Sequence, residues 1–521
     1  MTPQGDAPHV NKWLVTFAVM LPTFIEVMDT SVVNVSLPHI QGSLNAGLDE
    51  STWVLTSYLV SNAVIIPITG WLASVFGRKR YLIFSIVIFT LSSLFCGAAP
   101  SLGALVFFRV LQGLGGGGLQ PLSQAILLET FPQREHGIAM AAFGMGVVMA
   151  PILGPVVGGW ITDNWSWRWV FYINLPGGLL ALALALLFIH DPKYIKRSTF
   201  RIDTWGLFLL TVGLGCLQIV LDKGEREDWF SSDFIVILSI VAVVALAAFV
   251  VVELTVEHPV VNLRVFKHKN FAAGTINMFA GFFCLFGSIV LLPLYLQNLM
   301  GYTAYWAGLV LGPGGLASFC MMPIAGILMK RGVNPRNLLV VGLLVSSSSL
   351  WLMSGLNLEA DFVSVSIPRF VQGFGMGLFF VPLSAATYYG LKREEMGNAS
   401  GIFNLLRNLG GSFGTAFSTT MLSQRSQVHQ SFLVERVTPY SSALQSHFDE
   451  IGRWLHTRPM HGSGEKGLLA MLYAEVQRQA SMLAFNDAFY FLSITTALLL
   501  LLAPFFHRPA DRGTAPASMG H

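Results

Sequence analysis

Charged residues are scarce in this chain of 521 residues, because Asp, Glu, Lys and Arg together make up only 11% of it. Hydrophobic residues make up 53%, and the mean hydropathy is +0.61. A water-soluble chain of this length would carry about twice that share of charge. The composition therefore excludes an ordinary soluble protein and predicts a chain that folds in lipid.

Cysteine is also rare, and motifs of several functional classes are missing. The four cysteines lie inside apolar stretches, whereas a disulfide framework or a zinc site would group them in polar loops. The sequence has no G-x-x-x-x-G-K-[ST] loop, and its G-x-G-x-x-G match at Gly113 to Gly118 follows no strand. No cluster of His, Asp or Cys marks an enzyme, and a net charge of +3 is too small to indicate nucleic acid. We therefore expect no enzyme, metal site, cofactor or nucleic-acid partner.

Runs of about 20 apolar residues recur along the chain, each long enough to cross roughly 30 Å of membrane hydrocarbon as a helix. The alternating pattern of a membrane barrel is absent, so we predict an all-α membrane protein with fourteen transmembrane helices. Their predicted bounds are Trp13 to Asn34, Trp53 to Ala73, Tyr81 to Ala99, Leu102 to Leu128, Gly137 to Ile161, Trp169 to Ile189, Trp205 to Leu221, Phe234 to Glu253, Phe271 to Gln297, Trp306 to Met329, Leu338 to Gly355, Phe362 to Leu391, Ala399 to Leu422 and Asp487 to Phe506.

The distribution of basic residues orients these helices. With the N-terminus inside, nineteen Lys or Arg residues fall in the predicted inner segments, and only Arg168, Lys223 and Arg226 fall in the short outer loops. This bias follows the positive-inside rule, so both termini are predicted to be cytoplasmic. One long hydrophilic stretch, residues 423–486, is then an outer loop. Its last part, Leu468 to Phe485, has apolar residues at helical spacing and predicts a helix. This helix is either amphipathic, lying on the membrane surface or against a partner, or an ordinary surface helix.

Two parts of the chain repeat each other. The segment from Arg109 to Gly113 recurs from Arg369 to Gly373, and Pro67-Ile-Thr-Gly70 recurs as Pro323-Ile-Ala-Gly326. We therefore predict two six-helix bundles, at 1–190 and 271–521, joined by two inserted transmembrane helices within 191–270. Repeated bundles that rock about a shared site are typical of transporters.

Ionisable residues inside a membrane are costly, so each is a candidate for function. Glu26 and Asp29 lie three residues apart on one face of the first predicted helix, and Arg109 is the only charge in the fourth. A buried carboxylate beside a guanidinium can be tuned between its protonated and ionised forms, so we predict a proton-coupling site of Asp29, Glu26 and Arg109. A fixed ion pair that only positions helices is the alternative for Asp29, and a substrate contact is the alternative for Glu26.

A second set of residues is a candidate for a substrate cavity. The second half has the intramembrane cations Arg369 and Arg407 but no acid at comparable depth. Polar, aromatic and methionine side chains accommodate varied ligands, although packing roles are the alternative for each. The candidates are Asn34, Tyr58, Gln112, Met145, Met149, Asn404 and Arg407. A further cluster in the fifth predicted helix, Gly154, Pro155, Gly158 and Gly159, predicts a close and kinked helix contact.

Several sequence motifs are similar to those of one transporter family. They include Met28-Asp29-Thr30, the loop that holds Gly70, Gly77, Arg78 and Lys79, and the Gly154-Pro155-x-x-Gly158-Gly159 motif. The chain resembles the drug/proton antiporters of the major facilitator superfamily with fourteen spans, and among them the EmrB-type multidrug exporters. It departs from the superfamily loop at Ser74, where an acid is usual, which weakens any ionic gate at that position.

The resemblance implies a two-bundle fold, proton antiport and, in Gram-negative cells, assembly with a periplasmic adaptor and an outer-membrane channel. We therefore expect a proton-coupled exporter of lipophilic toxic compounds in the bacterial inner membrane. Export of one metabolite, fatty acid or siderophore is the alternative within the same class, and a membrane enzyme or sensor is the alternative from another class.

Overall fold

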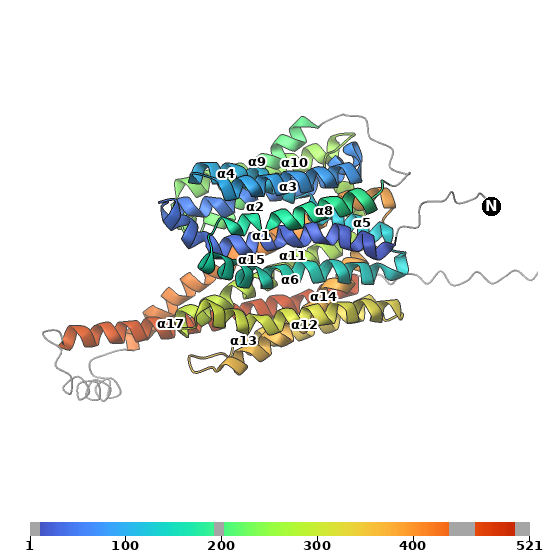
Figure 1. Cartoon of the computed structure of the whole chain (residues 1–521). Coiled ribbons are helices and arrows are strands. Elements are labelled where there is room, and N and C mark those ends of the chain that lie inside the picture. The colour runs from blue at the N-terminus through green and yellow to red at the C-terminus, as the bar shows by residue number, and fades with distance from the viewer. Residues whose placement is uncertain (1–10, 192–202, 437–463, 506–521) are drawn as a thin grey trace, which may run out of the picture.

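The computed structural model describes residues 11–191, 203–436 and 464–505, and these residues form helices and connecting turns without a strand. Figure 1 shows the long helices running side by side. Within these ranges, thirteen helices are long and apolar enough to cross a membrane. The described part of the chain is thus a multi-pass helical bundle, as the apolar runs predict.

The first half consists of six spans packed around α1. Its helices are α1 (Lys12–Ser43), α2 (Leu48–Phe76), α3 (Arg78–Ala98), α4 (Leu102–Gly116), α5 (Leu119–Thr130), η1 (Gln133–Glu135), α6 (His136–Asn164), α7 (Trp169–Tyr172) and α8 (Asn174–Phe188). The fourth predicted span is divided into α4 and α5 within a run of four glycines, which favours an interruption because glycine lowers helix propensity.

Two helices follow that have no counterpart in the repeat. They are α9 (Thr204–Lys223) and α10 (Asp233–Thr255), with the short η2 (Trp229–Ser231) between them. They pack on each other, and α9 also packs on α2. Four of the basic residues in the predicted inner segments, Lys193, Lys196, Arg197 and Arg201, lie outside the described residues.

The second half repeats the first in outline. Its elements are η3 (Leu263–Lys267), α11 (Lys269–Leu294), η4 (Tyr295–Leu299), α12 (Ala304–Lys330), α13 (Pro335–Met353), α14 (Phe362–Thr387), η5 (Arg393–Glu395), α15 (Met396–Arg436), α17 (Gly464–Leu498) and η6 (Leu499–Phe505). The predicted span 399–422 lies in α15, which packs on α11, α17 and α2 but is not among the thirteen apolar helices.

The helices extend into the predicted outer loop at 423–486. α15 continues to Arg436 and α17 begins at Gly464, so helices replace loop at both ends, and 437–463 lies outside the described residues. The predicted surface helix is the first part of α17, and it is continuous with the last span. In Figure 1 these two helix ends project beyond the bundle, on the side away from the N-terminus. Asp487 joins them by accepting from Arg425 Nε at 2.6 Å and pairing with His429 Nε2 at 2.7 Å.

Small residues bring the repeated helices into backbone contact. A Cβ atom on Gly410 or Gly414 of α15 would lie 2.2 Å from the carbonyl oxygen of Phe279 or 2.1 Å from that of Phe283, both on α11. Glycines four residues apart lie on one face of a helix, and in membranes such pairs allow close helix packing. This contact therefore requires glycine at both positions.

We expect Gly414→Ala to destabilise the protein by about 1 to 3 kcal/mol, because the added methyl meets backbone that cannot rotate away. Thermal unfolding of the purified protein in detergent measures the effect. Gly308→Ala is the matched control, since a Cβ at Gly308 meets no atom within 4 Å. Equal unfolding temperatures for the two variants would contradict the proposed packing of α11 on α15.

Candidate functional site

Asp29 and Arg109 form an ion pair in the interior of the first half. Arg109 Nη1 donates to Asp29 Oδ2 at 2.6 Å, and the side chains of both residues are fully buried. Arg109 Nε also donates to the carbonyl oxygen of Val54 at 3.0 Å, which connects α4 to α2. Two charges in an apolar bundle are tolerable only as such a pair, so the sequence-predicted residues are brought together.

Neutral amides complete the surroundings of the Asp29 carboxylate. Oδ1 accepts from Asn174 Nδ2 at 2.6 Å and from Gln112 Nε2 at 3.0 Å. The Tyr58 ring covers the Arg109 guanidinium, with 4.1 Å between the ring centre and Cζ. Asp29 therefore makes three hydrogen bonds to α4 and α8 inside a closed pocket.

Glu26 has different surroundings, with neutral donors in place of a direct cation. Its Oε1 accepts from Tyr58 Oη and from Asn62 Nδ2, each at 3.0 Å, and its Oε2 accepts from Gln120 Nε2 at 2.7 Å. Gln120 Oε1 in turn accepts from Arg407 Nη2 of α15. A chain of two hydrogen bonds thus links a buried carboxylate of the first half to an arginine of the second.

A cavity of about 1000 Å³ lies between the two halves. Its walls come from α1 and α6 on one side and from α11, α12, α14 and α15 on the other, and most of the lining side chains are apolar. The lining reaches Asn164, the last residue of α6, and Gln120 deeper in the bundle. A cavity of this size and character accommodates a lipophilic small molecule.

The predicted cavity residues divide into two groups. Asn34 and Arg407 line the cavity. The other five, Tyr58, Gln112, Met145, Met149 and Asn404, are not among its described lining residues. Tyr58 and Gln112 bond to Glu26 and Asp29, Asn404 Nδ2 donates to Gln124 Oε1 at 2.6 Å, Met145 packs against the core, and Met149 is half-buried on α6.

The cavity is closed at the end of the bundle where α1 begins. There Glu135 accepts from Lys12 Nζ at 2.5 Å and from Lys330 Nζ at 2.9 Å, so one carboxylate joins the two halves. A Cβ on Gly70 would lie 2.6 Å from the backbone nitrogen of Asn398, which shows that α2 touches α15 directly. The cavity therefore faces the opposite end, where α6 stops.

The loop between α2 and α3 is held by acids outside its own sequence. Gly77 has a φ of +89°, which favours glycine, and Lys79 N donates to Asp191 Oδ1 at 2.8 Å. Arg78 pairs with Glu129 of α5. Ser74 Oγ donates to the carbonyl oxygen of Trp71 at 2.7 Å. Arg78 of this loop therefore makes its ionic contact with Glu129 of α5 and not with the residue at position 74.

The Gly and Pro cluster of α6 has one face that packs on α1 and another that lines the cavity. Gly154 and Gly158 pack on α1, where an added Cβ would lie 2.5 Å from Ser31 Cβ or 2.9 Å from Val32 Cγ1. Pro155 and Gly159 line the cavity instead. One motif therefore fixes α6 to α1 while it forms part of the cavity wall.

Three amides of the site, Asn62, Gln120 and Asn174, were not identified from the sequence. Each lies in a predicted membrane span and donates to one of the two buried acids. A polar amide within an apolar run is the signal that points to such positions, because a buried amide needs partners.

Helices that enclose a cavity within the membrane, closed at one end, are typical of transporters that move small molecules. The sequence model of the Major Facilitator Superfamily matches residues 19–415, and the chain belongs to this family. It is therefore a transporter and not an enzyme.

Individual relatives agree with this assignment. The chain is 40% identical over 499 residues to the multidrug export protein EmrB of Haemophilus influenzae, covering 95% of this chain and 96% of the relative. It is 36% identical over 499 residues to the fatty acid resistance protein FarB of Neisseria gonorrhoeae, with the same coverage. The crystal structure of the human organic anion transporter MFSD10 superposes with a TM-score of 0.61 over 95% of this chain and all of that chain at 14% identity, which shows the fold alone. The predicted resemblance to EmrB-type exporters and the two-bundle fold are confirmed.

We expect Asp29→Asn to lower the free energy of unfolding by about 3 to 5 kcal/mol, because it leaves the buried Arg109 guanidinium without a counter-charge. Glu26→Gln removes no ion pair and is expected to cost less. Thermal unfolding in detergent compares the two. The double variant Asp29→Asn/Arg109→Gln should recover part of the loss, and an unrecovered double variant would contradict a pairwise origin.

Proposed function

We propose that the chain is a proton-coupled multidrug efflux transporter of a bacterial inner membrane, which exports lipophilic toxic compounds. The 40% identity to a protein named as a multidrug exporter supports this substrate class. The apolar cavity of about 1000 Å³ supports it independently, because it has the size and lining for varied lipophilic molecules.

The observation that carries the proton coupling is the different bonding of the two buried acids of α1. Asp29 is paired to Arg109 in a closed pocket, whereas Glu26 has only neutral donors and is one hydrogen bond from the cavity-lining Gln120. A buried carboxylate without a direct cation is easier to protonate. In this proposal Glu26 exchanges the proton with the cavity, while the Asp29–Arg109 pair holds the surrounding helices in place.

Transport then requires the closed end to open. The contacts of Glu135 with Lys12 and Lys330, and of Gly70 with Asn398, would separate as the halves rock. With both termini cytoplasmic, as the basic residues predict, the cavity faces the periplasm in this conformation. Release on that side fits an exporter.

The partners are proposed from the resemblance and the shape of the molecule. A periplasmic adaptor and an outer-membrane channel would receive the substrate. The projecting ends of α15 and α17 lie on the same side as the cavity mouth, which makes them the natural docking element for the adaptor (Figure 1).

Export of a fatty acid or another specific metabolite is the second candidate. Two observations favour it: the 36% identity to a fatty acid resistance protein, and the presence of Arg369 and Arg407 in the cavity wall. Resistance profiles across unrelated compounds distinguish one substrate from many.

We expect Glu26→Gln to abolish uphill transport of a lipophilic dye into or out of proteoliposomes with an imposed pH gradient, while dye exchange without a gradient continues. The amide retains the shape and polarity of the carboxyl group but cannot take up a proton. Asp29→Asn should also lose uphill transport, and in cells it should raise substrate accumulation to that of a strain without the transporter.

Glu225→Gln is the matched control, because it makes the same chemical change at an exposed residue between α9 and α10. It should transport at the wild-type rate. If Glu26→Gln still concentrated dye against its gradient, Glu26 would have no place in the proton path.

A further inference from the structure

The two repeated arginines, Arg109 and Arg369, have the same local bonding but different counter-charges. Arg109 Nη1 donates to Gln112 Oε1 at 2.8 Å, and Arg369 Nη1 donates likewise to Gln372 Oε1, three residues later in each case. In the first half the amide nitrogen of Gln112 then donates to the Asp29 carboxylate. In the second half the amide nitrogen of Gln372 donates to the neutral Ser288 hydroxyl at 2.8 Å, and within the described part of the chain Arg369 forms no ion pair with an acid.

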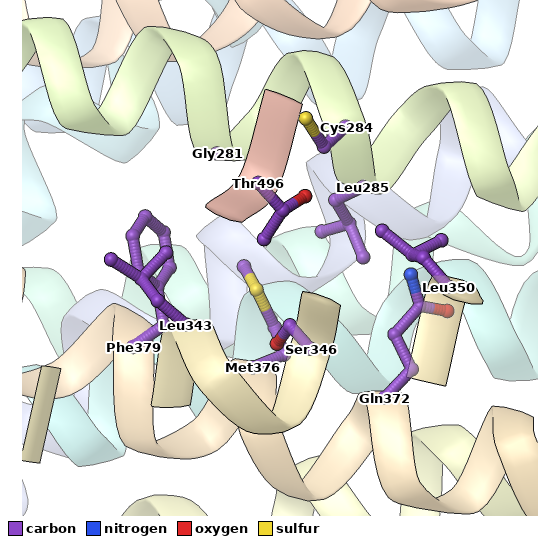
Figure 2. A pocket seen from close by; sticks show the side chains of 10 residues that line it. All are labelled: Gly281, Cys284, Leu285, Leu343, Ser346, Leu350, Gln372, Met376, Phe379 and Thr496. Carbon is purple, nitrogen blue, oxygen red and sulfur yellow. The ribbon is translucent and has the colours of Figure 1, made fainter. Parts of the chain in front are cut away.

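By its hydrogen bond to the repeated glutamine, Ser288 of α11 takes the place of Asp29 of α1. Cys284 lies four residues before Ser288, on the same face of α11. Figure 2 shows Cys284, Thr496 and Gln372 around a small pocket of about 20 Å³ in the second half. This volume holds about one water molecule, so the pocket beside Gln372 has no room for a larger ligand.

The ring that covers Arg109 is also missing in the second half. A Cβ on Gly113 would meet the carbonyl oxygen of Tyr58 at 2.6 Å, and one on Gly373 would meet that of Gly314 at 1.8 Å, so Gly314 is the counterpart of Tyr58. Gly314, Gly373 and Arg369 all line the large cavity. The replacement of tyrosine by glycine therefore leaves Arg369 facing the cavity instead of an aromatic ring.

The charges around the cavity are unbalanced. Among its described lining residues the cations are Arg369 and Arg407, and the one carboxylate is Asp163, next to the end of α6 at the mouth. Arg407 is 2% exposed, and its Nη1 has no hydrogen-bond partner. Arg369 Nε is likewise buried without a partner. A buried guanidinium with unused donors is costly until an acceptor arrives.

We propose that the cavity binds a lipophilic carboxylate, whose anionic group pairs with Arg369 and so replaces the acid that the second half lacks. Arg407 adds positive potential deeper in the cavity, and the apolar body of the ligand packs on aromatic walls that include Phe282, Phe286 and Phe380. The inference rests on the proposed function for the role of the cavity, and it names the charge of the substrate.

Equilibrium binding to the purified full chain in phosphatidylcholine nanodiscs tests this inference without a proton gradient or an anionic lipid. The probes are radiolabelled 1-naphthylacetate and its neutral amide, which share the same apolar body. Wild-type protein should bind the carboxylate at least about tenfold more tightly than the amide, as a charge-assisted pair provides. Arg369→Gln should abolish this preference and leave the affinity for the amide unchanged.

A second variant keeps the arginine and supplies its missing partner. Ser288→Asp places a carboxylate at the residue that Gln372 contacts, as Gln112 contacts Asp29 in the first half. It should reduce carboxylate binding by about the same factor as Arg369→Gln, whereas Ser288→Asn, of the same size as Asp and without charge, should bind like wild type. Size-exclusion profiles and the amide affinity show whether each variant is folded.

Equal affinity of wild type for the carboxylate and the amide would overturn the inference, and so would a loss of both ligands in Arg369→Gln. Transport in proteoliposomes separates this result from the proposed function. Proton-driven transport of neutral compounds with no carboxylate preference would refute the anion site alone, whereas carboxylate binding without gradient-driven transport would refute the efflux mechanism alone.

Discussion

A guanidinium group buried in an apolar bundle needs a negative partner, and this requirement determines which helices meet in the interior of the first half. Arg109 meets it internally: Asp29 of α1 supplies the charge, the backbone of α2 accepts from Arg109 Nε, and an amide of α8 donates to the same Asp29 carboxylate. Four helices therefore converge on one pair, and removing either charge would leave the other uncompensated at a cost of several kcal/mol. Arg369 retains the same glutamine contact but no acid, so the repeat makes the two halves alike in backbone and unlike in charge.

The close packing within each half determines where the halves can move. Glycines on one face of α6 and α15 bring them against α1 and α11, so the contacts inside a half are made by backbone atoms. Contacts between the halves at the closed end include the exposed amines of Lys12 and Lys330 on Glu135 and the backbone contact of Gly70 with Asn398. Surface ion pairs are weak, whereas packed helices resist deformation. In the proposed transport cycle the ion pairs of Glu135 and the contact of Gly70 with Asn398 would separate, while each half keeps its own packing.

Hydropathy and charge patterns predicted the helical membrane bundle and the meeting of Asp29 with Arg109, because apolar runs and isolated charges can be read directly from the sequence. They could not assign polar side chains to the cavity. Tyr58, Gln112 and Asn404 are bonded within the protein, since a polar residue in an apolar helix satisfies itself equally well against another helix. The helical end of α15 beyond Leu422 was also missed, because a polar helix and a polar loop have similar hydropathy. The first part of α17 was predicted, since Leu468 to Phe485 has apolar residues at helical spacing.

The bridge from Glu26 through Gln120 to Arg407 connects the unlike halves. A glutamine amide has one donor end and one acceptor end, so its orientation depends on which neighbour accepts a hydrogen bond and which one donates. With Glu26 ionised, Gln120 turns its nitrogen to the carboxylate and its oxygen to the guanidinium. In the proposed mechanism a proton on Glu26 would remove part of the demand for that nitrogen and weaken the hydrogen bond from Arg407 to Gln120. The charge state of an acid in the first half would thereby alter an arginine that lines the cavity from the second, without any direct contact between the two charges.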